Sequence, residues 1–163
     1  MVTGVQLPLV LLVGLFVGAL RQAPAPSDIV VLQSRTPQLG ACPAGTRRLA
    51  SRVGDDGSSS DFTIPEGHAL VVTSVVWKGT GQPQRIYNVS VMIVGDPAQS
   101  EVLGGAGTMS DADGNISGAA QFSPGFVAKH GTTLCAAVKR GVSNPTAATN
   151  QFVKLYGVLT KHK

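Results

Sequence analysis

The chain has 163 residues, enough for one domain with a hydrophobic core. Only 13% of them are charged, and the abundance of Gly, Ala, Val, Ser and Thr is typical of a β-rich extracellular domain rather than a helical bundle. The net charge is +4, but the basic residues form no stripe interleaved with aromatics, which argues against a nucleic-acid-binding protein and leaves a weak attraction to anionic surfaces.

The first 20 residues differ from the rest. Val5–Leu20 is an uncharged, mostly apolar run, and the Pro-rich stretch QAPAPS follows it closely. Such a run is typical of a secretory signal peptide, with cleavage expected after Ala19. The preceding MVTG has no Lys or Arg, so an uncleaved anchor is the alternative, although the run is short for a span of ~20 residues; a buried element is the third. Residues 1–20 are therefore expected to be a signal peptide or N-terminal anchor, and the protein to be secreted or extracytoplasmic, in the periplasm or at the cell surface.

Residues 21–43 are expected to form an extended, Pro-containing segment. Its one apolar run, DIVVLQS, is either an early strand or a tether. The β-domain is expected to occupy residues 44–163. It begins with a polar, turn-rich stretch in which Gly54–Asp61 is expected to form a mobile loop.

From Phe62 onward, short strands alternate with turns. The best strand candidate, Ala69–Trp77, has two largely apolar faces and is expected to be central in its sheet. One face is assigned Ala69, Val71, Val75 and Trp77, and the other Leu70, Val72 and Val76. The further expected strands are 85–94, 100–110, 115–122, 126–128, 133–138 and 151–159, with a break at Ser123-Pro124-Gly125.

These six to eight strands, with no helical periodicity and no repeat, predict a single all-β domain. We expect an antiparallel β-sandwich, jelly-roll-like or immunoglobulin-like. The stretches IPEGHALVVTSVVW, SPGFVAKHGTTLCAAV and FVKLYGVLT together resemble small exported bacterial β-sandwich proteins of unknown function, over residues 62–159. The resemblance implies a fold and no particular activity.

The two cysteines, Cys42 and Cys135, are far apart in the sequence. An exported protein with two cysteines most simply pairs them, so a disulfide is expected, with two buried free thiols as the alternative. The sequence holds no Cys-x-x-Cys motif, which argues against a zinc or thioredoxin-like centre.

A weak candidate for a metal site surrounds the turn at Pro65. The pattern Pro-x-Gly-x-x-Leu resembles the start of a cupin jelly roll, in which metal-binding members carry a His-x-His pair. Here His68 stands alone because position 70 is Leu. Glu66, His68 and the distant His130 could supply three ligands, but two histidines in surface turns explain the same pattern.

A second weak candidate is the stretch DADGN. Asp111, Asp113 and Asn115 match the first, third and fifth ligands of an EF-hand calcium loop, but the sixth and twelfth positions hold Ile116 and Phe122 instead of Gly and Glu. A hairpin turn is the simpler interpretation. We expect no cofactor, with calcium as the exception that this loop leaves open.

Signatures of catalysis are hard to find. The sequence has no Gly-x-Ser-x-Gly motif, and its nine acidic residues lie mostly in turn-like contexts. Sugar-binding sandwiches stack their ligands on exposed aromatic side chains; Trp77, Tyr87 and Tyr156 are weak candidates for this, and each fits a core position equally well.

We therefore expect an exported, non-enzymatic β-sandwich with a structural, adhesive or partner-binding role. The partner would be protein or carbohydrate at the cell surface, and strands with two apolar faces would also allow homo-oligomers. A carbohydrate- or calcium-binding module is the alternative, and a hydrolase or cupin-like metal enzyme the second. Nucleic acid is not expected as a partner, and a membrane only through the N-terminal segment if that segment is uncleaved.

Overall fold

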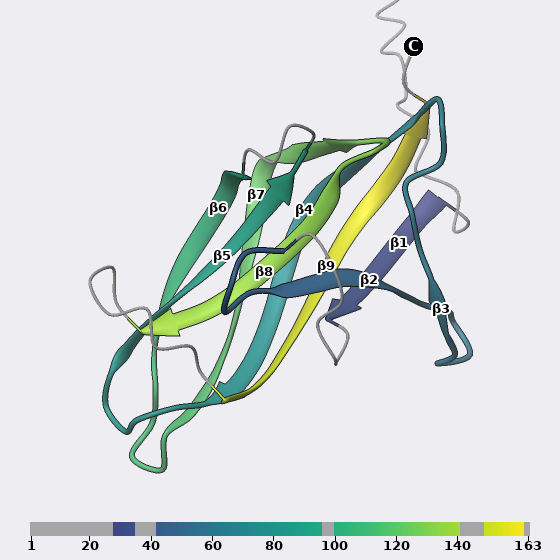
Figure 1. Cartoon of the computed structure of the whole chain (residues 1–163). Helices are drawn as coiled ribbons and strands as arrows, with labels where there is room; N and C mark the ends of the chain where they lie inside the picture. The colour runs from purple at the N-terminus through teal and green to yellow at the C-terminus, as the bar shows by residue number, and fades with distance from the viewer. Residues whose placement is uncertain (1–27, 35–41, 96–99, 141–148, 162–163) are drawn as a thin grey trace, which may run out of the picture.

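A computed structural model of the chain describes residues 28–34, 42–95, 100–140 and 149–161, and every element in them is a β-strand (Figure 1). The strands are β1 (Ile29–Ser34), β2 (Arg47–Val53), β3 (Ser59–Asp61), β4 (His68–Thr80), β5 (Ile86–Val94), β6 (Ser100–Met109), β7 (Asn115–Lys129), β8 (Thr133–Arg140) and β9 (Thr149–Lys161).

The strands form one antiparallel sheet in the order β6-β5-β8-β2-β1-β9-β4-β7, with β3 paired to β2. β2 joins two halves: it pairs with β1 between Leu49 and Arg52, and with β8 at Arg47 and Arg48. In Figure 1, β5 and β8 pass in front of β4 and β9. The outermost strands β6 and β7 approach each other, and Thr108 Oγ1 donates to the Ser117 carbonyl at 3.0 Å. The sheet is therefore nearly closed into a barrel-like shape. The all-β antiparallel prediction is confirmed, and the sandwich stays a prediction.

Of the two interpretations of the run DIVVLQS, the early strand is confirmed: it forms β1, which lies between β2 and β9. Two expectations for the residues that follow are corrected. The stretch expected to be turn-rich contains β2 as well, in which Leu49 and Ser51 point inward and are buried. The expected loop at Gly54–Asp61 is a turn followed by β3, which pairs with β2. A search for apolar runs does not detect β2, because its seven residues, RRLASRV, include three arginines.

The expected break at Ser123-Pro124-Gly125 is an interruption of the pairing only: Gln121 pairs with Ser74 and Phe126 with Val72, so residues 122–125 have no direct partner on β4. β7 runs through it as a single strand of 15 residues, rather than as two strands. Proline lacks the N–H that a strand needs for pairing on both sides, but β7 pairs only with β4. An outer strand can therefore accommodate Pro124.

The central position of β4, between β9 and β7, is confirmed. The assignment of its faces was wrong, because the register shifts between Val72 and Ser74 on both sides. This β-bulge inserts Thr73 as an extra residue, so the alternation of faces changes phase. The buried, inward side chains are Leu70 and Val72 before the bulge and Val75 and Trp77 after it.

The core fills the space enclosed by the sheet. Its fully buried members include Val30, Leu32, Val91, Val138 and Leu155, which come from four different strands. Cys42 and Cys135 form the expected disulfide, with their Cα atoms 5.8 Å apart. Cys135 packs with Met92 and Val94 in a separate apolar cluster on the other face of its strand, as the alternation of β8 predicts.

Candidate functional site

The structure brings the two candidate histidines to one end of the sheet. β4 and β7 pair through Ala69 and Lys129, and His68 and His130 are the next residues outward on each side. His68 Nδ1 lies 3.0 Å from the Glu66 carbonyl, and His130 Nδ1 lies 2.7 Å from the Ile64 carbonyl. Both rings therefore hold the backbone of the turn that leads into β4.

A metal site is not assembled there. Among the described residues, no three His, Cys, Asp or Glu side chains lie close enough together to hold an ion. Lys161 on β9 pairs directly with His68 at this end of the sheet.

The DADGN stretch is a tight turn between β6 and β7 that uses its own carboxylate. Asp111 Oδ1 accepts hydrogen bonds from the Asp113 and Asn115 backbone N–H groups at 2.9 and 2.7 Å, and Oδ2 accepts one from the Asn115 amide at 3.0 Å. These bonds, first that of the Asn115 side chain, lower the pKa of Asp111. The hydrogen bonds explain the acidic pattern as a hairpin turn.

Gly114 completes this turn. Its φ is +83°, in the left-handed region, and an added Cβ would collide with the Gly81 carbonyl oxygen. The Gly81 N–H donates to the Gly114 carbonyl at 2.8 Å. The turn after β6 is thereby held against the turn after β4.

The three aromatic candidates for sugar stacking differ in their exposure to solvent. Trp77 and Tyr87 are only 3% and 2% exposed and belong to the core. The Tyr87 hydroxyl accepts a hydrogen bond from the Gln82 N–H at 2.7 Å. Only Tyr156 lies on an outward face, half-buried. A sugar therefore cannot stack on Trp77 or Tyr87 in this structure.

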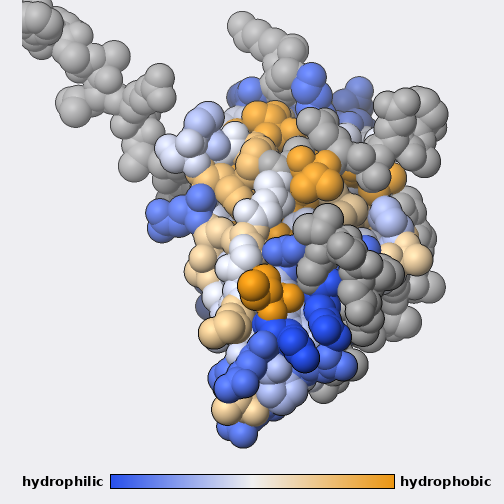
Figure 2. Space-filling model, turned by 90° about the vertical axis from the view of Figure 1, so that its left-hand side faces the viewer, coloured by the Kyte–Doolittle hydropathy of each residue, from blue (hydrophilic) through white to orange (hydrophobic). Residues whose placement is uncertain are grey.

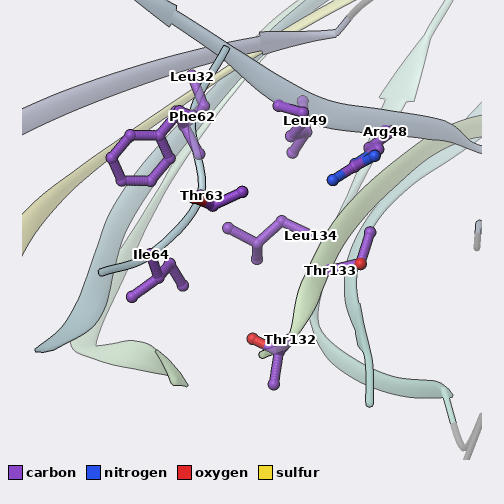
Figure 3. Close-up of a pocket in the computed structure, with 10 residues that line it drawn as sticks. Leu32, Arg48, Leu49, Phe62, Thr63, Ile64, Thr132, Thr133 and Leu134 are labelled. Carbon is purple, nitrogen blue, oxygen red and sulfur yellow. The ribbon is translucent and has the colours of Figure 1, made fainter. Parts of the chain in front are cut away.

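A small cavity opens at the end of the barrel, between β2 and the start of β8 (Figure 3). In the close-up, Leu49 and Leu134 face each other, with Arg48 at the side and Thr132 below. Its volume is about 30 Å³, room for about one or two water molecules. It is too small for an organic substrate.

The outward face of β1, β9, β4 and β7, which we call the outer face, carries an unusual apolar row. Directly paired positions on the four strands hold Ile29, Val158, Val71 and Val127, one from each strand. Ile29 is 49% exposed and Val127 is 48% exposed. Val76, two rows further along β4, is 40% exposed. A half-solvated sheet normally has polar side chains on its outward side.

An aromatic ring with two lysines lies at one end of the outer face. Phe152 on β9 pairs with Lys78 on β4, and Lys154 pairs with Val76 in the next row. The Lys78 and Lys154 ammonium groups lie 5.2 and 5.6 Å from the centre of the Phe152 ring. Cation–π attraction of this kind contributes roughly 0.5–1 kcal/mol per exposed pair.

Two hollows border the outer face. One, of about 320 Å³, lies beside Lys78, Thr80 and Ser117. The other, of about 520 Å³, lies between β1 and the β2–β3 hairpin, with Ile29, Val31 and Arg52 in its lining. The Arg52 guanidinium donates to the Ile29 carbonyl at 3.3 Å. Neither hollow is a closed cleft that could enclose a small ligand. The outer face is therefore better suited to a partner with a broad contact surface.

A second set of exposed apolar side chains, Ile86, Val102 and Met109, lies on β5 and β6. Ile86 and Met109 are directly paired and are 63% and 69% exposed. Seen from the side of β6 and β7, apolar residues gather mainly in the upper half, and the lower end, where the turns after β4 and β6 lie, is hydrophilic (Figure 2). This pair is isolated, whereas the row on the outer face continues across four strands.

Sequence reasoning missed the outer face because it depends on two features. The bulge at Thr73 decides which valines of β4 point outward, and the pairing of β1 with β9 adds Ile29 to the row. The sequence did indicate that β4 and β9 carry apolar residues on both faces. It did not indicate how the strands pair, and the pairing register decides which of these residues form one row.

The described residues include no helix with the length and hydrophobicity that a membrane crossing requires. No protein-family model matches the chain, and no curated protein was found to be similar to it.

Proposed function

We propose that this chain is an exported, non-enzymatic β-domain with an adhesive or partner-binding role at the cell envelope. The outer face is its binding surface. The observation that carries the proposal is the row Ile29, Val158, Val71 and Val127, which places apolar side chains outward on four adjacent strands. Contiguous exposed apolar surface on a folded domain marks interaction sites.

Export is supported by the Cys42–Cys135 disulfide, because such bonds persist mainly in oxidising compartments. The apolar run at Val5–Leu20 supports it as well. We also propose that the two halves of the sheet, joined through the short β2–β8 pairing, pack as a jelly-roll-like or immunoglobulin-like sandwich.

A catalytic function is less well supported by the described residues than a binding function. The Nδ1 atoms of His68 and His130 both contact backbone carbonyls of one turn. A general base needs a ring nitrogen directed at a substrate proton, and neither histidine lines any of the three hollows described above. The cavity lined by Arg48 and Thr132 holds no more than water.

A carbohydrate ligand is the second candidate, because Tyr156 and Phe152 both lie on the outer face. Aromatic side chains on one sheet face are the usual platform for sugar rings. Glycan-array binding that is lost in Tyr156→Ala and retained in Tyr87→Phe would support it. An array without signal would remove it.

The proposed surface can be tested by binding the labelled protein to envelopes of the cell that produces it. The test variant Val76→Ser/Val127→Ser removes exposed apolar groups from the outer face. The control variant Ile86→Ser/Met109→Ser removes two that are more exposed, on β5 and β6. We expect at least a several-fold loss of binding in the first variant only, since each buried Val contributes roughly 1.5 kcal/mol.

Equal binding by both variants and the wild type would contradict the proposal. Light scattering on the wild type and the two variants tests whether the outer face binds a second copy of the chain. A dimer that Val76→Ser/Val127→Ser dissolves would identify the partner as a second copy of the chain.

A further inference from the structure

The outer face has a one-sided charge. The sequences of β1, β4, β7 and β9 contain no Asp or Glu, although the whole chain has nine acidic residues. Three lysines point outward from these strands: Lys78 on β4, Lys129 on β7 and Lys154 on β9. The face is therefore cationic without internal compensation, and it favours an anionic partner.

The lysines at one end share one aromatic neighbour. The Lys78 and Lys154 ammonium groups approach the same Phe152 ring, at 5.2 and 5.6 Å from its centre. The two ammonium groups therefore lie at most about 11 Å apart, and like charges repel each other. Within the part of the chain that the structure describes, neither ammonium has a carboxylate partner. An anionic group that contacts both lysines would relieve this repulsion.

The apolar row lies between the cations. Lys129 is two residues beyond Val127 on β7, and Lys78 lies up to roughly 24 Å from Val71 along β4 at ~3.4 Å per residue. Tyr156, with an apolar ring and a polar hydroxyl, occupies the row next to Val158 on β9. The face thus has an aliphatic row near its Lys129 end, aromatic side chains beside that row, and cations at both ends.

This arrangement matches the surface of a bilayer. Aliphatic side chains enter the boundary between head groups and acyl chains, Tyr rings lie at head-group level, and lysines reach the phosphates with their flexible stems. We propose that the outer face docks on an anionic lipid surface, as a specific form of the envelope binding proposed above, on which this inference rests.

Other anionic polymers fit the same residues less well. A polysaccharide or nucleic acid would need hydrogen-bonding side chains for its hydroxyl groups or bases. Ile29, Val71, Val127 and Val158 offer none, yet together they cross all four strands of the face. A lipid surface uses both the aliphatic row and the lysines.

The test is flotation of the full chain with two kinds of vesicle, phosphatidylcholine alone and phosphatidylcholine mixed with phosphatidylglycerol. The run Val5–Leu20 is uncharged, so any binding through it should be similar for the neutral and the anionic vesicles. The informative quantity is therefore the ratio of the two partition coefficients. We expect a ratio well above ten at about 0.1 M salt, where the screening length is about 10 Å, and its loss near 1 M salt, where it is about 3 Å.

The face variant is Lys78→Gln/Lys154→Gln. It should lower the ratio about 25-fold, that is about five-fold or ~1 kcal/mol for each lysine. The control, Lys139→Gln/Arg140→Gln, removes the same charge from β8 in the other half of the sheet and should keep the ratio within about two-fold, because charges beyond one screening length contribute little.

A wild-type ratio near one would overturn the proposal, as would an equal decrease in both variants, which would indicate net charge rather than the outer face. Binding to heparin or DNA without binding to anionic vesicles would also overturn it, in favour of a soluble polyanion. If the ratio is near one but envelope binding still requires Val76 and Val127, the lipid assignment alone is wrong. If envelope binding does not require them, the proposed function fails as well.

Discussion

Phe126 on β7 lies directly over Gly104 on β6: a Cβ added to Gly104 would come within 2.7 Å of Phe126 Cε2. Phe122 and Phe126 contact each other edge-on, with ring centroids 4.6 Å apart, and Phe122 also borders Gly104 at 3.1 Å. The gap between the outermost strands is therefore filled by two aromatic side chains that require a residue without a Cβ opposite them.

We predict that Gly104→Val destabilises the fold by about 1–3 kcal/mol, because a larger side chain must displace the packed rings. Gly107→Val in the same strand is the matched control. Its added Cβ would meet only Asn88 Oδ1, at 3.9 Å, so we expect a change within ~0.5 kcal/mol. Urea denaturation measures both. Equal losses would mean that the seam is not closed by the phenylalanines.

The disulfide between Cys42 and Cys135 should be a major contribution to stability. The two residues are 93 positions apart, and the chain-entropy model gives about 4–5 kcal/mol for closing a loop of that length, as an upper value. Cys42→Ala/Cys135→Ala should unfold at much lower urea than the wild type. A reductant should lower the wild type to the same midpoint and leave the variant unchanged. A variant as stable as the oxidised wild type would contradict the prediction.

The Asp111 carboxylate should stabilise the turn in its ionised form. Hydrogen bonds from the Asn115 side chain and backbone lower its pKa from the ordinary value of 3.8. A group with a lowered folded-state pKa stabilises the protein above its unfolded pKa, and this contribution is lost as the pH falls through the folded pKa. Asp111→Ala should therefore lower the urea midpoint at neutral pH, and the difference should shrink below pH 3.8.

Asp113→Ala is the control for this turn, because only the backbone N–H of Asp113 contacts Asp111. Its urea midpoint should stay near that of the wild type at every pH. The same variants test the calcium alternative by calorimetry. Heat on calcium addition that both substitutions abolish would identify the loop as a cation site instead.

Trp77, the single tryptophan, is buried, and its Nε1 has no hydrogen-bond partner in the described part of the chain. An unpaired buried donor costs about 1–3 kcal/mol, so Trp77→Phe removes that cost while it loses volume. We expect a net loss below ~1 kcal/mol for Trp77→Phe and about 3–5 kcal/mol for Trp77→Ala. Thermal unfolding followed by circular dichroism measures both. A loss in Trp77→Phe as large as in Trp77→Ala would show that Nε1 has a partner, such as a buried water.

The sequence by itself determined the all-β class, most strand positions, the central place of β4 and the cysteine pairing. These depend on local patterns: alternation with a period of two, turn residues such as Asp-Gly, and the redox logic of two cysteines in an exported chain. These predictions need no knowledge of which strands pair, because each depends on local sequence patterns or on the number of cysteines.

The tertiary structure decided what faces outward. One inserted residue, Thr73, changed the phase of β4 and moved Trp77 into the same inward set as Leu70 and Val72. The strand β2 was missed because its stability comes from pairing with β1 rather than from its own hydrophobicity. The outer face depends on the register of four strands, which a single sequence does not specify, since side-chain direction reverses with every one-residue shift.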